Sequence, residues 1–296
     1  MSKDLVARYI WLVDTLTRYR RLTREEIMTL WLRSPLSQGE AMPERTFFHY
    51  RRAVEENFHI EIKCNSYGEY YIDDTTSKNL RGLSNWLVDS YAVNNLLRDS
   101  ADAADRMEVE DVPSAREFLA TALEAIRHNQ QVTFSYQSFS RSRPEEVRFS
   151  PYLLKRYKQR WYMYGLKENS GTRTYALDRV LSMRIESTRF ELPPDVDARS
   201  VFGCIIGVTS SKAAVRTVRL ETTRNQAKYL RALPLHHSQQ EELHDHYSIF
   251  TYRLKLNYEL VSEILALGPE VKVLEPSELR TMVTTRLRET LDLYQD

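Results

Sequence analysis

The sequence has little of what marks several large classes of protein. Its 296 residues include 2 cysteines, Cys64 and Cys204, with 8 glycines and 10 prolines. Two distant cysteines exclude a disulfide framework and a cysteine-based zinc site, and so few glycines and prolines exclude a collagen-like or low-complexity chain. No apolar run approaches the ~20 residues of a membrane helix, the mean hydropathy is −0.52, and the N-terminus lacks the apolar core of a signal peptide. We therefore expect a soluble, cytoplasmic protein with no membrane partner and about two domains.

The chain as a whole also lacks an excess of charge, with 42 basic and 41 acidic residues and a net charge of +1. The balance is nevertheless uneven along the chain. Residues 1–79 are neutral, residues 80–126 carry −5, residues 127–190 carry +8 from 13 basic and 5 acidic residues, and residues 191–296 carry −2. Arginines outnumber lysines in the basic segment, and aromatic residues lie between them. This composition favours an anion or nucleic-acid site, although a solvated basic face would give the same count.

The first 79 residues show the pattern of three helices and a hairpin. Apolar residues at helical spacing between Leu5 and Leu16 predict a first helix. Thr23 and Glu26 form a capping box, so a second helix is expected from Arg24 to about Leu32. Pro43 to Glu56 reads as a third helix, and the short strands 60–62 and 70–72 read as a β-hairpin. This order predicts a winged helix-turn-helix domain over residues 1–79, whose third helix would enter the major groove of DNA.

The third helix is amphipathic, with Phe47, Tyr50 and Val54 on one stripe. Arg45-Thr46-Phe47 resembles the opening of the recognition helix in many bacterial regulators, whereas His49-Tyr50 stands where those regulators more often carry Arg-Asp. Phosphate contacts need local rather than total charge, so the neutral balance of this segment does not oppose DNA binding. A winged helix that contacts protein is the alternative. The candidate DNA-binding residues are Arg24, Arg45, Thr46, Phe48, His49, Arg51 and Arg52.

Residues 80–128 read as an acidic helical linker, after which the periodicity changes to that of strands. Several short alternating segments from Gln131 to Val180 suggest a small, half-open β-barrel. Four features occur in order along them: Ser135-Tyr136, Arg148 ahead of Pro151-Tyr152, Trp161-Tyr162-Met163, and Leu177-Asp178-Arg179-Val180. Together they resemble a WYL domain, an Sm-like or SH3-like barrel, with Met163 as a volume-conserving replacement of the usual leucine.

The resemblance places the WYL domain at residues 129–192 and implies that it senses a ligand. We expect Asp178 to pair with and orient a neighbouring arginine rather than to touch the ligand. Arg148, Arg173 and Arg179 are the strongest candidates, because a buried arginine needs either Asp178 or an anion. Trp161 is as well explained by the core as by stacking on a ligand. The ligand-facing positions implied by the resemblance are Tyr136, Arg148, Tyr152, Lys155, Arg156, Trp161, Arg173, Asp178 and Arg179.

Residues 193–296 predict strands and helices in alternation, a small α+β domain. The segment 263–276 resembles the C-terminal extension of WYL regulators, and with no catalytic signature we expect this domain to mediate dimerisation or communication between subunits. His236, His237, His244 and His246 fall in a polar stretch that reads as a solvated loop rather than a metal site. The predicted fold class is therefore α+β and multidomain: a winged helix-turn-helix, a helical linker, a barrel and a small α+β domain.

The leading hypothesis is a homodimeric transcriptional regulator, more in keeping with a repressor than an activator, that binds a pseudo-palindromic double-stranded operator. Its WYL domain would sense an anionic effector such as a nucleotide or a nucleic acid. The family resemblance implies control of a phage-defence operon, with no cofactor or metal. One alternative is an accessory module that regulates a partner enzyme through the barrel. A nucleotide-processing enzyme is less favoured, because Glu145, Glu146, Glu168, Asp178 and Glu186 lack metal-ligand spacing.

Overall fold

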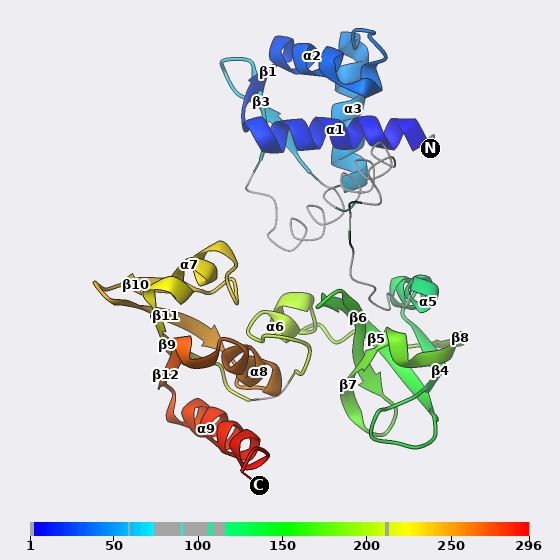
Figure 1. Ribbon diagram of the computed structural model, residues 1–296. Helices are drawn as coiled ribbons and strands as arrows, with labels where there is room; N and C mark the ends of the chain where they lie inside the picture. Colours follow the sequence, from blue (N-terminus) through cyan, green and yellow to red (C-terminus); the bar gives the residue numbers. More distant parts are fainter. Residues whose placement is uncertain are drawn as a thin grey trace. The chain divides into compact units, whose positions relative to one another are not determined.

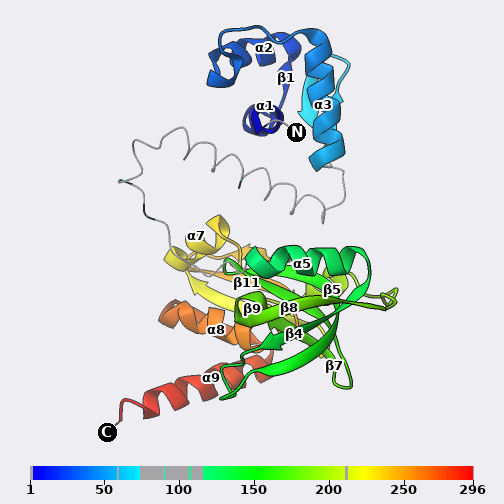
Figure 2. The same ribbon diagram turned by 90° about the vertical axis from the view of Figure 1, so that its right-hand side faces the viewer.

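The computed structural model describes residues 3–58, 60–73, 90, 106, 108, 116–210 and 213–295. The chain divides into two compact units, Met1–Glu110 and Asp111–Asp296, which are taken separately below. The described residues form helices and three antiparallel sheets, an α+β fold (Figures 1 and 2). Before residue 116, the predicted linker of residues 80–128 lies outside the described residues, except at positions 90, 106 and 108. None of the described helices is long and apolar enough to cross a membrane.

The N-terminal unit contains the three helices and the hairpin expected from the sequence. Its helices are α1 (Lys3–Tyr19), α2 (Arg24–Arg33), the 3-10 turn η1 (Pro35–Ser37) and α3 (Glu44–Phe58), and its strands are β1 (Leu22–Thr23), β2 (Ile62–Cys64) and β3 (Glu69–Ile72), in the sheet order β1-β3-β2. The predicted capping box is confirmed: the Thr23 amide donates to Glu26 Oε2 at 2.8 Å, and the Glu26 amide donates to Thr23 Oγ1 at 3.3 Å. The two-residue strand β1 was not predicted.

One hydrophobic core holds this unit together. Phe47, Tyr50 and Val54 of α3 are all buried in it, as the amphipathic pattern predicted. The Phe47 ring packs edge-to-face against Tyr70 of β3, with ring centroids 4.8 Å apart. The hairpin is thereby held against the buried side of α3, and the opposite side of the helix remains available to solvent.

The C-terminal unit begins with helix α5 and a five-stranded sheet. Its elements are α5 (Arg116–Arg127), β4 (Gln130–Tyr136), β5 (Glu145–Tyr157), β6 (Arg160–Lys167), β7 (Gly171–Ala176), the 3-10 turn η3 (Leu177–Arg179) and β8 (Val180–Arg189), in the sheet order β7-β6-β5-β4-β8. Helix α5 falls within the predicted linker, and its residues Ala122 and Ala125 are fully buried in the core of this sheet. Figure 2 shows α5 lying along β4, β5 and β8.

Strand β5 changes the direction of its side chains partway along. Val147 and Phe149 point into the core, but the register with β6 shifts between Pro151 and Leu153. Because an extra residue reverses which side chains face which way, Leu154 lies in the core, whereas Leu153 joins a second, outer apolar cluster. That cluster packs β5 and β6 against helix α6 (Ala198–Phe202).

A four-stranded sheet follows, in the order β10-β11-β9-β12. Its elements are β9 (Arg216–Thr223), α7 (Arg224–Ala232), β10 (Gln240–Leu243), β11 (Tyr247–Leu254), α8 (Tyr258–Ala266), the 3-10 turn η4 (Gly268–Glu270), β12 (Val271–Glu275) and α9 (Ser277–Asp292). The three helices and three of the strands were predicted. Strand β10 lies in the polar stretch that we interpreted as a loop, and all four of its residues are exposed.

Candidate functional site

The exposed side of α3 carries most of the predicted DNA-binding residues. Arg45, Phe48, His49 and Arg52 are exposed, and Phe48 keeps 42% of its surface in solvent despite being aromatic. The Tyr9 hydroxyl lies 3.4 Å from His49 Nε2, which helps to fix the imidazole against α1. A helix that presents two arginines, an aromatic ring and a histidine on one face has the residue types that contact phosphates and base edges.

The remaining predicted residues of this unit lie at its margins or are paired. Arg24 Nη1 is 3.6 Å from Glu44 Oε2, and Arg51 Nε is 3.3 Å from Glu55 Oε1. Thr46 is half-buried in the first turn of α3. Among the ion pairs of the described residues, none includes Arg45 or Arg52. These two arginines therefore carry the positive charge of α3 that is not neutralised locally.

In the C-terminal unit, three of the predicted ligand residues meet where β7 turns into η3. The Asp178 carboxylate pairs with Arg160, a residue that we did not predict, so Asp178 does orient an arginine as expected. The Arg179 guanidinium carbon lies 3.7 Å from the centroid of the Phe139 ring. Burial raises the pKa of Tyr136, and the charge of nearby Arg179 opposes this rise. We call Tyr136, Arg160, Asp178 and Arg179 the η3 cluster.

Two buried polar atoms of the η3 cluster lack a hydrogen bond. Asp178 Oδ1 and Arg179 Nε are both inaccessible to solvent, and neither has a partner among the described residues. A buried polar atom without a partner costs about 1–3 kcal/mol. A group that hydrogen-bonded to Arg179 Nε or to Asp178 Oδ1 would relieve this cost.

The position of Arg160 directly before Trp161 is a sequence signal that it belongs to the site. No sequence signal indicates that Asp178 is its partner. Lys158 and Gln159 both have a positive φ, 46° and 63°, and form the two-residue turn that pairs Tyr157 with Arg160. This turn has none of the Asn-Gly or Asp-Gly signals typical of such hairpins. Arg156 is exposed and lies opposite Trp161 in the register, and Trp161 packs partly buried against the core of the five-stranded sheet.

The structure does not bring Tyr152 and Lys155 to the η3 cluster. Tyr152 is buried in the outer apolar cluster, where its ring centroid lies 5.4 Å from that of Phe190. Lys155 donates to the backbone oxygen of Gly207, and its Nζ lies 4.7 Å from the centroid of the Phe202 ring. Burial lowers the pKa of Lys155 to about 8, against an opposing effect of Glu259. Both side chains therefore contact the segment that leads to the four-stranded sheet.

Arg148 and Arg173 lie towards the other end of the sheet and are exposed. Arg148 Nη1 is 4.0 Å from Glu168 Oε2, and Arg173 donates to the Thr172 backbone oxygen at 2.8 Å and to Ser170 Oγ at 3.2 Å. An exposed guanidinium keeps its hydration and incurs no burial cost. The argument that a buried arginine needs an anion or Asp178 therefore applies to Arg179 and not to these two.

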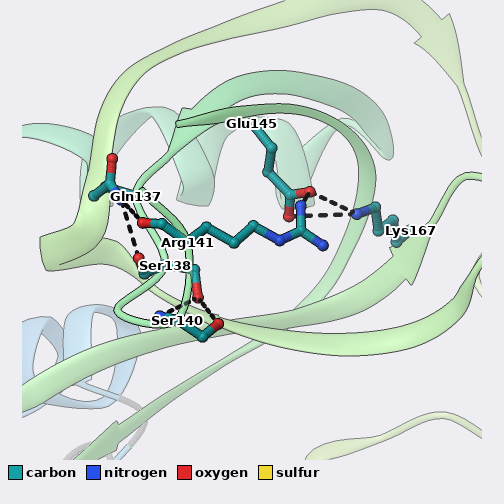
Figure 3. Close-up of polar contacts among 6 residues, drawn as sticks. All are labelled: Gln137, Ser138, Ser140, Arg141, Glu145 and Lys167. Atoms are coloured by element: carbon teal, nitrogen blue, oxygen red, sulfur yellow. Dashed lines mark hydrogen bonds and ion pairs between the residues drawn. The ribbon is translucent and has the colours of Figure 1, made fainter. Parts of the chain in front are cut away.

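The loop between β4 and β5, which carries Phe139, is held by a network of polar contacts (Figure 3). Gln137 Nε2 donates to the backbone oxygens of Ser138 at 3.0 Å and Arg141 at 2.6 Å. The Arg141 guanidinium pairs with Glu145, which also accepts from Lys167 Nζ at 3.4 Å. The network anchors the loop at both ends, so that Phe139 is presented above Arg179.

The acidic residues of the basic segment 127–190 are all engaged by cations. Each of its five carboxylates lies in an ion pair with an arginine or a lysine, namely Glu145, Glu146, Glu168, Asp178 and Glu186. Among the described residues, no group of three or more His, Cys, Asp or Glu side chains is placed to hold a metal ion.

Two domain profiles match parts of the chain. Residues 117–185 match the sequence profile of the WYL domain, and residues 214–291 match that of the WCX domain. No curated protein matches the chain significantly. Among solved structures, the chain is similar to proteasome accessory factor B/C (PafBC) of Arthrobacter aurescens, with 21% identity, a TM-score of 0.35, and coverage of 85% of this chain and 41% of that one. It is also similar to a CRISPR Cas-related protein, with 12% identity, a TM-score of 0.36, and coverage of 85% and 72%.

Proposed function

We propose that this chain, which carries a WYL domain followed by a WCX domain, is a homodimeric, sequence-specific DNA-binding transcriptional regulator. The observation that carries the proposal is the exposed side of α3, where Arg45 and Arg52 flank Phe48 and His49. A capped helix, a second helix that exposes such a face and an antiparallel hairpin are the parts of a winged helix-turn-helix. In this arrangement α3 reads the major groove of the DNA. The hairpin, which has Tyr67 exposed at its tip, lies along the DNA backbone.

DNA binding is tested by a gel shift and a footprint on the DNA upstream of the protein's own gene. We expect Arg45→Ala and Arg52→Ala each to weaken binding about tenfold or more, since a base contact contributes about 1–3 kcal/mol. If either arginine contacts a phosphate instead, its variant lowers the slope of affinity against salt by about 1. Arg18→Ala is the matched control, because Arg18 lies on α1, 3.9 Å from Asp14. Absence of sequence-specific binding at ~100 mM salt would refute the proposal.

The WYL domain, in this proposal, senses an anionic effector such as a nucleotide or a nucleic acid at the η3 cluster. Arg179 supports this assignment, because its buried Nε lacks a partner and its guanidinium stacks on an exposed aromatic ring. A base could stack beside Phe139 while a phosphate accepts from Arg179. We expect Arg179→Ala to abolish effector-dependent release from the operator and Arg173→Ala to leave it intact. Equal behaviour of the two variants would place the effector elsewhere.

Homodimer formation is supported by α9. Leu287 and Leu291 lie one turn apart on α9, Tyr294 follows the end of the helix, and all three are exposed. An apolar stripe of this kind packs against a second helix more readily than it faces water. We expect Leu287→Glu with Leu291→Glu to give a monomer in sedimentation velocity, while the exposed Arg288→Glu does not. A wild-type protein that sediments as a monomer would contradict the assignment.

The role of repressor and the control of a phage-defence operon rest on the family resemblance. A reporter fused to the upstream DNA tests the role of repressor, since deletion of a repressor raises expression and deletion of an activator lowers it; the identity of the neighbouring genes tests the control of a phage-defence operon. The pairing of all five carboxylates in the basic segment favours a sensor over a nucleotide-processing enzyme. A stable complex with a partner enzyme in the absence of operator binding would instead support an accessory module.

A further inference from the structure

The domain built on the four-stranded sheet contains a cavity that none of the functions above uses. It has a volume of about 530 Å³ and lies between α7 and the strands β10 and β11, which are neighbours in Figure 1. Small-molecule sites have volumes of about 300–1,000 Å³. The cavity is formed by residues other than those of the η3 cluster, so it is independent of the proposed effector site.

One wall of the cavity is positively charged. Arg224, Lys228 and Arg231 follow one another at helical spacing along α7, whereas Ala227 and Leu230 are buried against the sheet. The helix begins at Arg224, so the positive end of its dipole lies on the same side as Arg224. These features together favour a negatively charged occupant.

The charge of this wall is only partly neutralised from within the domain. Arg231 donates to both carboxylate oxygens of Glu241, at 2.7 Å each, and is thereby fully engaged. Lys228 Nζ lies 3.4 Å from Asn225 Oδ1, which is neutral. The ion pairs within residues 213–295 include neither Arg224 nor Lys228. Two cations thus face a cavity in which the one lining carboxylate already has its partner.

A second and independent observation comes from the strand side of the cavity. Ser248 of β11 lines it and is only 1% exposed. Its hydroxyl is buried and makes no hydrogen bond with any described residue. The neighbouring Glu241 is paired with Arg231, which holds the pKa of that carboxyl below its usual range. A buried hydroxyl without a hydrogen bond is costly, and an acceptor oxygen in the cavity would relieve that cost.

We propose that this cavity binds a small phosphate-bearing anion, of the class of inorganic phosphate and nucleoside monophosphates. Arg224 supplies a guanidinium fork for two phosphate oxygens, Lys228 supplies a second positive charge, and Ser248 donates its hydroxyl. The chain would then possess a second anion site in its WCX domain, besides the one proposed in the WYL domain.

The experiment is isothermal titration calorimetry, which measures the dissociation constants of the full-length protein for phosphate and for AMP. Chloride holds the ionic strength constant. We expect saturable binding that Arg224→Gln and Lys228→Gln each weaken about tenfold or more, as the loss of a charged hydrogen bond implies. Arg253→Gln is the matched control, because Arg253 is exposed on β11 and its side chain points to the opposite face of the sheet from Ser248. Thermal unfolding of each variant without ligand confirms that it is folded.

Ser248→Ala provides a variant that leaves the charge unchanged. We expect it to weaken binding without lowering the stability of the ligand-free protein, because its hydroxyl makes no hydrogen bond there. Tighter binding of AMP than of phosphate assigns the cavity to a nucleotide, and equal binding assigns it to the phosphate group alone. The Arg179→Ala variant should retain this binding, which separates the cavity from the proposed effector site. Binding by the α7 variants equal to that of wild type, or no saturable binding at millimolar ligand, would overturn the proposal.

Discussion

Lys155 offers a quantitative test of how the two sheets of the C-terminal unit are joined. Its ammonium group is packed over Phe202 and donates to the Gly207 backbone oxygen, and burial lowers its pKa from 10.5 to about 8. This difference corresponds to about 3 kcal/mol of free energy by which folding disfavours the charged form. Because part of the side chain reaches solvent, which screens the charge, we expect about 2 kcal/mol to appear in the measured stability.

The sign follows from the protons bound by the folded and unfolded states. Below pH 8 both states hold the proton on Lys155, and the full cost of burying the charge is present. Between pH 8 and 10.5 the folded state has lost the proton while the unfolded state retains it, so the free energy of unfolding rises with pH. Above 10.5 both states are neutral at this residue and the cost has disappeared.

The assay is urea denaturation followed by circular dichroism at pH 7, 8, 9 and 10, for wild type and Lys155→Met. The other titrating groups, tyrosines included, are the same in both proteins and cancel in the difference. We expect wild type to gain about 2 kcal/mol relative to the variant between pH 7 and 10. A comparison at pH 7 alone is not decisive, because Lys155→Met has two opposing effects on the free energy of unfolding. It removes the cost of a buried charge, and it also removes the hydrogen bond to Gly207. Lys158→Met removes a charge from a side chain that is 66% exposed, lies in the turn after β5 and pairs with Glu263 at 2.7 Å, so it separates loss of an exposed charge from loss of a buried one. A difference between wild type and Lys155→Met that does not change with pH would refute the reasoning.

Three further predictions follow from single contacts. Thr23→Ala removes the capping box of α2 and should destabilise the N-terminal unit by about 1 kcal/mol, which chemical denaturation measures; Thr23→Ser should restore most of the loss. Gly165→Ala would place a Cβ 2.0 Å from the Ser150 backbone oxygen, so we expect a loss of about 2 kcal/mol or more and a lower melting temperature, whereas Gly171→Ala, with open space around it but a strained φ of 80°, should cost less. Glu259 Oε1 accepts from the Val208 and Thr209 amides at 3.1 and 2.9 Å; Glu259→Ala removes this acceptor and should speed hydrogen exchange at both amides about tenfold, and unchanged rates would show that these bonds do not hold the segment.

What could be predicted from the sequence is what neighbouring residues determine. Thr23 and Glu26 lie one helical turn apart, so their capping box and the start of α2 at Arg24 followed from the sequence. The buried stripe of α3 followed from spacing in the same way. Strand β10 could not be found by this route, because its four residues are all exposed and show no alternation of polar and apolar side chains. It is a strand because it pairs with β11, where Glu241 lies opposite Phe250.

The residue types of the candidate site could be predicted from the sequence, but which of these residues lie together in space could not. That Asp178 would hold an arginine followed from its charge, but the choice of Arg160 depends on a turn that brings the start of β6 beside η3. The placement of Lys155 depends on the bulge between Pro151 and Leu153. Without that extra residue Lys155 would face the same side as Val147 and Phe149; with it, Lys155 faces the outer cluster. One inserted residue thus reverses the expected role of every side chain that follows it.

The same bulge gives β5 two functions on its two faces. Arg156 lies on the face that leads to Trp161 and the core of the five-stranded sheet, whereas its neighbours Lys155 and Tyr157 face away from that core. Lys155 donates to Gly207, and the Tyr157 hydroxyl donates to Glu263 Oε1 of α8 at 2.8 Å. Neighbouring residues of one strand therefore border the core of the WYL domain, contact the segment before the WCX domain (Lys155) and contact the WCX domain itself (Tyr157). Because the register of β5 is fixed by β4 and β6, we expect a displacement of β5 to move the contacts of Lys155 and Tyr157 as well, so these two contacts are where a coupling between the domains should be tested first.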